Sequence, residues 1–170
     1  MAVALDQLNT GGEAAFTAAL GHLFEHSPWV ATVTWADRPF RSQEQLHAAL
    51  FSLKRAATRE RQLDLIRALP DLAGRLAQSR RLPADSTREQ ASAGLDLLTD
   101  AELAEFVALN AAYTARFGFP FVICARLNAK DAILEAMRRR LGHAPETEFA
   151  AALEEIGKIA RLRLIDTVSA

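Results

Sequence analysis

The sequence predicts an all-α fold, with a single compact multi-helix domain over residues 1–170. Half of the residues are hydrophobic but only 7% are aromatic, a balance rich in alanine and leucine that is typical of helical proteins. Serine and threonine recur three residues before glutamate or glutamine, which is the capping-box pattern of a helix start. The segments that follow carry apolar residues three or four positions apart, as one face of a helix requires.

The capping boxes and apolar stripes place the predicted helices along the chain. The boxes pair Thr10 with Glu13, Ser42 with Gln45, Ser86 with Glu89 and Thr99 with Glu102. Ser27 followed by Pro28 is the pattern of an N-cap with proline at the first helical position. The remaining predicted helices cover 58–68, 131–141 and 146–165, and Gly118 ends the long helix that Thr99 opens.

One segment, GFPFVICAR, departs from the helical pattern. Its apolar residues Phe119–Ala125 follow the β propensity of an extended chain, and no second strand is evident to pair with it. A buried extended segment must still place its peptide N–H and C=O groups on some partner. Helix ends, water and a ligand are the options for such a segment, and a linker that crosses the core is the alternative without a function.

Charge and cysteine content exclude several classes of protein. The net charge is −1 with neutral histidines, so no overall field attracts nucleic acid or an anionic membrane. No apolar stretch is long enough to span a bilayer. Cys124 is the only cysteine, which excludes an internal disulfide and favours a reducing compartment. The beginning of the sequence, MAVALDQLNTGGEAAF, lacks the pattern of a secretory signal, so we predict a cytoplasmic protein.

Few residues carry a recognisable chemical motif. His22 and His26 flank Glu25 without the H-E-x-x-H pattern or an evident third ligand, so no metal site is predicted. Cys124 lies in the apolar run VICA and is interpreted as a buried, inert thiol. The basic runs KRAATRERQ and MRRRLG are interpreted as solvated helix faces.

Two places remain as candidate binding sites. In STREQASAGLD, the predicted helix start puts Glu89 and Gln90 in the first turn, beside free N–H groups that suit a small heterocycle. The alternative is that Glu89 only caps the helix. In IARLRLID, Arg163 lies between two leucines, and is either a buried anchor for an anion or an arginine whose head reaches water.

Several motifs together resemble the 2-oxo-4-hydroxy-4-carboxy-5-ureidoimidazoline (OHCU) decarboxylases. They are FEHSPWVA, RALPDLAG, STREQASAGLD, LTDAELAEFVALNAAYTARFGFPFVICAR and IGKIARLRL, in this order from about His22 to Leu164. The resemblance implies an all-α, cofactor-free enzyme that forms a homodimer. It further implies a small-molecule ureidoimidazoline substrate, which loses CO2 to give (S)-allantoin in urate degradation.

The resemblance also assigns the site residues. The resemblance implies that the substrate is bound by Pro70, Ser86, Thr87, Arg88, Glu89, Gln90, Arg163 and the backbone of Phe121, Val122, Ile123, Cys124 and Ala125. The family pattern His-Pro-Asp-Leu-Ala-Gly has a catalytic histidine where this chain has Leu69, and Glu89 would orient that histidine. Because Pro70 is expected to open the following helix, position 69 is expected at or next to its N-cap.

Leucine cannot donate or accept a proton, so impaired decarboxylation is expected. Leu69 is either an introduced substitution, a natural residue in a protein that now binds or reacts differently, or compensated by another acid such as His26. Two functions therefore stay open: a decarboxylase scaffold with a formed pocket and weak catalysis, and a non-catalytic ligand- or partner-binding helical protein.

Overall fold

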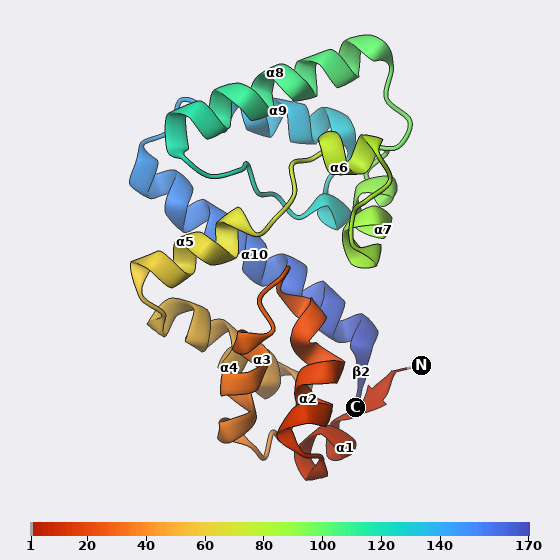
Figure 1. The fold of residues 1–170 in the computed structure, drawn as a ribbon, viewed down its shortest axis with the longest axis vertical. Helices are drawn as coiled ribbons and strands as arrows, with labels where there is room; N and C mark the ends of the chain where they lie inside the picture. The colour runs from red at the N-terminus through yellow and green to blue at the C-terminus, as the bar shows by residue number, and fades with distance from the viewer. Residues whose placement is uncertain (1) are drawn as a thin grey trace. The chain divides into compact units, whose positions relative to one another are not determined.

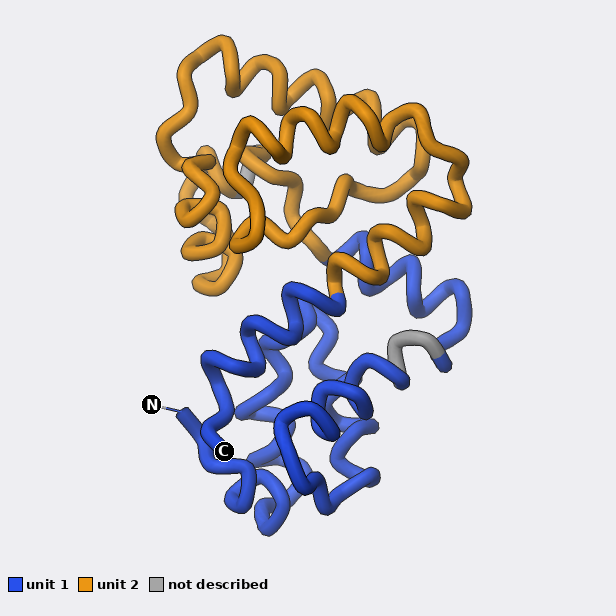
Figure 2. The backbone as a smooth tube through the Cα atoms, turned by 180° about the vertical axis from the view of Figure 1, so that it is seen from behind, with its two compact units in different colours: residues 1–68, 157–170 blue, residues 69–156 orange. Residues whose placement is uncertain are grey.

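The computed structural model describes residues 2–170, apart from the side chains of residues 53–55, 75 and 76. The chain forms two compact units, one of residues 1–68 with 157–170 and the other of residues 69–156 (Figure 2). Both units consist of helices, and within the described residues the strands are two residues long each. The prediction of an all-α fold is therefore confirmed. None of the described helices has the length and apolar character that crossing a membrane requires.

The first unit contains both ends of the described chain (Figure 1). Its elements are β1 (Val3–Ala4), α1 (Leu5–Thr10), α2 (Glu13–Leu20), η1 (Gly21–Leu23), α3 (Trp29–Thr34), η2 (Trp35–Asp37), α4 (Gln43–Ala56), α5 (Arg59–Arg67), the end of α10 (Pro145–Thr167) and β2 (Val168–Ser169). Strand β2 pairs in parallel with β1, with Val3 opposite Val168, and so ties the two ends of the chain together.

Two of the helix starts predicted in this unit are wrong. Thr10 is the last residue of α1, where its hydroxyl donates to the carbonyl of Asp6 at 2.9 Å, and α2 begins only after Gly12. The threonine bonds back into its own helix because LDQLNT already forms the preceding turns. Ser27 does not cap α3 either, since its hydroxyl donates to the carbonyl of Glu25 at 3.0 Å.

Two other starts in the first unit are confirmed by their capping bonds. The N–H of Gln45 donates to the Ser42 hydroxyl at 3.1 Å, and Thr58 caps α5 in the same way. The Gln45 side chain accepts from the N–H of Arg41, one residue before the predicted partner, at 2.6 Å. These helices therefore begin where local hydrogen bonding favours it.

The second unit contains the remaining elements. They are α6 (Arg75–Gln78), α7 (Ala84–Ser92), α8 (Asp100–Phe117), η3 (Ala125–Leu127), α9 (Lys130–Arg140) and the first part of α10. The capping box of Thr99 with Glu102 forms with both of its bonds, and Gly118 ends α8 with a φ of +77°. This positive φ is the left-handed conformation that glycine adopts without strain.

Two predictions in the second unit are wrong, and each involves a proline. Helix α7 begins at Ala84 after Pro83, so Ser86 is a buried residue inside the helix and not its cap. Pro70 opens no helix: the chain makes a turn, in which the N–H of Gly74 donates to Asp71 at 3.3 Å, before α6 begins at Arg75. Position 69 is therefore not at a helix N-cap.

The extended apolar segment runs from the end of α8 to η3, as predicted, and within the described chain it pairs with no strand (Figure 1). Phe119 and residues 121–125 are buried. The ring of Phe121 meets the Tyr113 ring edge-on, with 5.3 Å between the centroids. Aromatic packing against α8 thus anchors the start of this segment.

Candidate functional site

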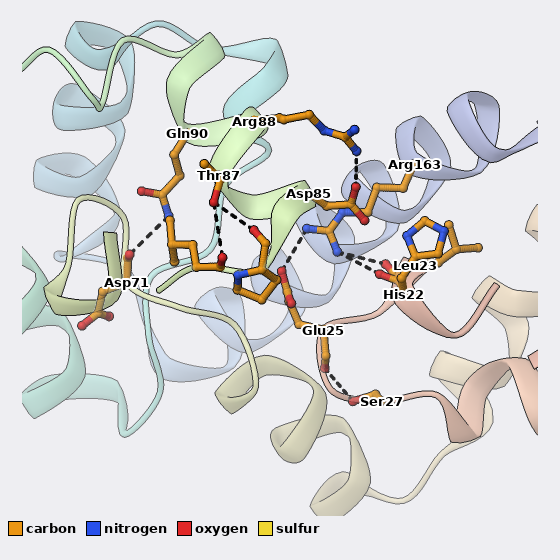
Figure 3. Close-up of polar contacts among 12 residues, drawn as sticks. His22, Leu23, Glu25, Ser27, Asp71, Asp85, Thr87, Arg88, Gln90 and Arg163 are labelled. Carbon is orange, nitrogen blue, oxygen red and sulfur yellow. Dashed lines mark hydrogen bonds and ion pairs between the residues drawn. The ribbon is translucent and has the colours of Figure 1, made fainter. Parts of the chain in front are cut away.

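Leu69 and Pro70 precede a turn at residues 71–74, and two buried amide side chains hold that turn. Gln90 of α7 donates to the carbonyl of Asp71 at 3.4 Å (Figure 3), and it accepts from the N–H of Ala73 at 3.0 Å. Both ends of the Gln90 amide are thus bonded to the main chain. The structure places Gln90 at the base of the turn that follows position 69.

Asn110 of α8 is the second amide, and the sequence reasoning missed it. Its Nδ2 donates to the carbonyl of Leu72 at 2.9 Å. The residue is 5% exposed, and its Oδ1 makes no hydrogen bond to any described part of the chain. A buried asparagine among the apolar positions of a helix was the available signal, because a polar side chain there must serve a specific partner.

The residues predicted on α7 divide between two faces of the helix. Ser86 and Gln90 are buried and Glu89 is half-buried, as expected for positions three and four apart. Thr87 and Arg88 are exposed: the Thr87 hydroxyl donates to the carbonyl of Pro83, and Arg88 forms an ion pair with Asp85 (Figure 3). Ser86, Glu89 and Gln90 are therefore the less exposed of the five predicted residues on α7.

Glu89 and the extended segment come together in this unit. Helix η3, which continues the segment, packs against α7. Burial raises the pKa of the Cys124 thiol, and the negative charges of Glu155 and Glu89 raise it further. The prediction of a buried, inert thiol fits this environment, and Glu89 lies close enough to the segment for its charge to act there.

The backbone of the segment is only partly available to a ligand. The carbonyl of Val122 accepts from Arg140 Nη1 at 2.8 Å, and the N–H of Cys124 donates to Glu155 Oε2 at 2.8 Å. Between these two bonds lies Ile123, whose N–H and C=O have no hydrogen-bond partner within the described chain. Of residues 121–125, the Ile123 peptide is the one that lies between two main-chain groups fixed by charged side chains.

A cavity of about 550 Å³ lies against α7 in the second unit. Its lining consists of Ala73, Ala77, Gln78, Arg80, Leu82, Thr87, Gln90, Ala91, Leu95, Asp96, Leu98 and Leu103. Of the predicted site residues, Thr87 and Gln90 contribute to this lining. Glu89 and the Ile123 peptide are not part of it, so the cavity and the Glu89 face of α7 are separate features.

Arg163 lies in the first unit, on α10, and it is 3% exposed. Its guanidinium donates to Glu25 Oε1 at 3.1 Å and to the carbonyls of His22 and Leu23 at 3.2 and 3.5 Å (Figure 3). The alternative of an arginine head that reaches water is therefore wrong. The anion that Arg163 holds inside this unit is the buried Glu25 carboxylate.

We expect Arg163→Met to lower the free energy of unfolding by about 3–5 kcal/mol, because it leaves the Glu25 carboxylate buried without its partner. Urea denaturation followed by circular dichroism measures this loss. The double variant Arg163→Met with Glu25→Met is the control, and it should lose less than the single variant. A single variant as stable as the unaltered chain would contradict the expected burial cost.

His26, the candidate for a compensating acid, lies in an exposed turn of the first unit with a φ of +50°. Leu69 begins the second unit.

For metal ions, the described residues contain no cluster of three or more His, Cys, Asp or Glu side chains that could hold one.

Comparisons with known proteins show which family this chain resembles. A family model for OHCU decarboxylase matches residues 9–165. The chain is 43% identical over 165 residues to the 2-oxo-4-hydroxy-4-carboxy-5-ureidoimidazoline decarboxylase of Haloferax volcanii, which covers 97% of this chain and 96% of that protein. It is also 43% identical to the uric acid degradation bifunctional protein PucL of Bacillus subtilis, over 97% of this chain but 33% of that protein.

A crystal structure of (S)-allantoin synthase has a similar fold, with a TM-score of 0.80 and 32% identity. The similarity covers 98% of this chain and 54% of the synthase, so the chain spans about half of that larger protein. The family model and the relative from Haloferax volcanii each extend over nearly the whole sequence. The chain belongs to the OHCU decarboxylase family.

Proposed function

We propose that this chain binds 2-oxo-4-hydroxy-4-carboxy-5-ureidoimidazoline and forms (S)-allantoin and CO2 from it in urate degradation, at a rate that Leu69 limits. The relatives over nearly the full length support this reaction. The observation that carries the proposal is that Glu89 lies close to the extended segment. In this segment the Ile123 peptide has no hydrogen-bond partner within the described chain.

The chemistry of decarboxylation defines what the site must supply. Loss of CO2 leaves electron density on the imidazoline ring, which must be stabilised and then protonated on one face. The Ile123 peptide offers one donor and one acceptor to the ring or the ureido group. Glu89 would polarise the substrate hydroxyl or a ring nitrogen. No cofactor is proposed, since the family resemblance implies none.

The other residues that the resemblance assigns to the site differ in how far the structure supports a role in binding. Ser86 shares the inner face of α7 with Glu89, and Pro70 directly follows position 69. Gln90 is bonded to the 71–74 turn, which supports a role in shaping the site. Thr87 lines the cavity against α7, whereas the exposure of Arg88 gives its side chain no support as a ligand. Arg163 is proposed from the resemblance, and its bonds to Glu25 and His22 support a role in fixing that segment of its own unit.

A homodimer and a cytoplasmic location also remain part of the proposal. The resemblance supports the dimer, and the single, buried Cys124 supports a reducing compartment. The second candidate function is non-catalytic binding of a ureidoimidazoline or of allantoin. One observation favours it: Leu69 is the single departure from the family pattern among the motifs that the chain otherwise keeps.

Binding of (S)-allantoin tests the pocket without requiring catalysis. We expect Glu89→Ala to weaken this binding about 10- to 100-fold in isothermal titration calorimetry, because a hydrogen bond to a charged group is lost. Glu105→Ala is the matched control, since it removes a carboxylate from α8 that pairs with Arg138 at the surface. Equal affinity in the Glu89 and Glu105 variants would contradict the assignment of Glu89.

A further inference from the structure

The extended segment raises a structural problem that a neighbouring strand normally solves. Phe119 and residues 121–124 are buried and form no helix, yet in the described chain no strand runs beside them. Buried peptide groups without partners are costly, so something else must fix the course of the backbone. Charged side chains from α9 and α10 do this, on both sides of Ile123.

Arg140 of α9 fixes the chain before Ile123. Its Nη1 donates to the Val122 carbonyl at 2.8 Å, and its guanidinium carbon lies 4.3 Å from the centre of the Phe121 ring. The residue is 6% exposed, which contradicts the interpretation of the MRRRLG run as a wholly solvated face. A planar guanidinium can stack on a ring and donate in its plane at the same time.

Glu148 holds the Arg140 guanidinium in this position. Arg140 donates to both carboxylate oxygens, with Nη2 at 2.9 Å from Oε2, and Glu148 is completely buried. The Tyr113 hydroxyl and His143 Nδ1 also contact this carboxylate. Burial tends to raise the pKa of Glu148, but hydrogen bonds from Arg140, Tyr113 and His143 outweigh it and hold the pKa below its ordinary value.

Glu155 of α10 fixes the chain after Ile123. Its Oε2 accepts the Cys124 N–H at 2.8 Å, while the Cys124 carbonyl accepts from Asn128 Nδ2 at 3.0 Å. Val122 and Cys124 are therefore each bonded to a side chain, and the Ile123 peptide between them is not, within the described residues. The arrangement thus fixes the main chain directly before and directly after the Ile123 peptide, whose own N–H and C=O stay available.

We propose that Arg140 and Glu155 are positioning residues, which fix the Ile123 peptide so that its N–H and C=O stay open for the substrate. This inference rests on the proposed function. Neither side chain needs to touch the substrate, because each acts through the main chain next to Ile123. Each group supplies a hydrogen bond to the main chain, a donor from Arg140 and an acceptor oxygen from Glu155.

The single cysteine provides a direct probe of this geometry. Labelling with 15N-cysteine gives one backbone amide resonance, that of Cys124. In Glu155→Ala the Cys124 N–H loses its charged acceptor, so the amide proton should move upfield and (S)-allantoin should bind about 10-fold more weakly or worse. Glu155→Gln keeps an acceptor oxygen and should restore most of the affinity. Alanine suits the α10 helix, so the variant is expected to fold.

Arg140→Lys tests the other side of Ile123. Lysine keeps a positive charge next to Glu148 but lacks the planar fork that bonds Val122 and stacks on Phe121. We expect a loss of (S)-allantoin affinity of about 10-fold or more. Arg138→Lys is the matched control on the same helix, because Arg138 pairs with Glu105 at the surface, and it should bind like the unaltered chain.

The outcomes separate this inference from the proposed function. If the unaltered chain binds (S)-allantoin and folded Glu155→Ala and Arg140→Lys bind it equally well, the inference is overturned and the proposed function stands. Equal weakening in Glu155→Ala and Glu155→Gln also overturns it, since the acceptor oxygen would then not matter. If neither the unaltered chain nor Leu69→His binds (S)-allantoin, both fail. Weakening in Glu155→Ala and Arg140→Lys, with rescue by Glu155→Gln, supports the inference.

Discussion

Replacing Leu69 with histidine should raise the rate of (S)-allantoin formation by about 10²- to 10⁴-fold, the usual contribution of general acid–base catalysis. Leucine cannot deliver a proton to the ring carbon after CO2 leaves, whereas an imidazole titrates near neutral pH. The measurement uses freshly generated substrate and follows the circular dichroism of the allantoin formed. It compares the unaltered chain with Leu69→His.

Leu69→Gln is the control for this experiment, because glutamine is polar but carries no titratable proton at neutral pH. It should gain no more than a small fraction of the histidine effect. A high rate in the unaltered chain would show that another residue supplies the proton. If Leu69→His binds (S)-allantoin but forms none, the non-catalytic function becomes the better proposal.

The surroundings of position 69 decide how an introduced imidazole would behave. The sequence suggested a helix N-terminus there, whose dipole would favour the neutral ring. The structure instead has Leu69 half-buried ahead of a turn, and α6 begins only at Arg75. The amides of Gln90 and Asn110 hold this turn through the main chain of residues 71–73. An imidazole at position 69 would thus lie between the C-cap of α5 at Ala68 and this turn, and not at the N-terminus of α6.

The fold could be predicted where local chemistry decides it. Thr99, Glu102 and Gly118 fix both ends of α8 through bonds and a backbone conformation within a few residues. The same S/T-x-x-E/Q pattern fails at Thr10 and Ser86, because the chain is already helical before each of them. A capping motif shows that a helix can start at a residue, whereas the preceding Gly12 or Pro83 determines where it does start.

The candidate site likewise contains residues that the sequence could predict and residues that only the structure reveals. Glu89 and residues 121–125 follow from the family resemblance, which is a pattern along the chain. Asn110 acts through Leu72, and Arg140 through Val122 and Glu148. These contacts could not be predicted from the sequence, because they join residues that are far apart or that have a simpler local explanation. Arg140 ends a basic run, and Glu148 lies near the start of α10, where an acidic residue already suits the helix dipole.

Replacing Glu148 with alanine should lower the free energy of unfolding by about 3–5 kcal/mol at neutral pH. The side chains of Arg140 and Glu148 are 8% and 0% exposed, so the substitution leaves a buried guanidinium without its counter-ion. The Tyr113 hydroxyl loses its acceptor at the same time. Urea denaturation measures the loss. Glu105→Ala, which breaks the exposed pair with Arg138, is the control and should cost about 0–1 kcal/mol.

The pH dependence of stability isolates the charge of Glu148 from its size. Because folding lowers the pKa of this carboxyl below its ordinary 4.5, its contribution is complete above that value. It is lost as the pH falls below 4.5 towards the lower pKa of the folded chain. Glu148→Gln keeps the shape but cannot titrate, so its stability should fall less than that of the unaltered chain between pH 6 and about pH 3. Parallel pH curves for the two proteins would mean that folding does not change the pKa of Glu148, which would contradict the stabilisation of its charge by Arg140.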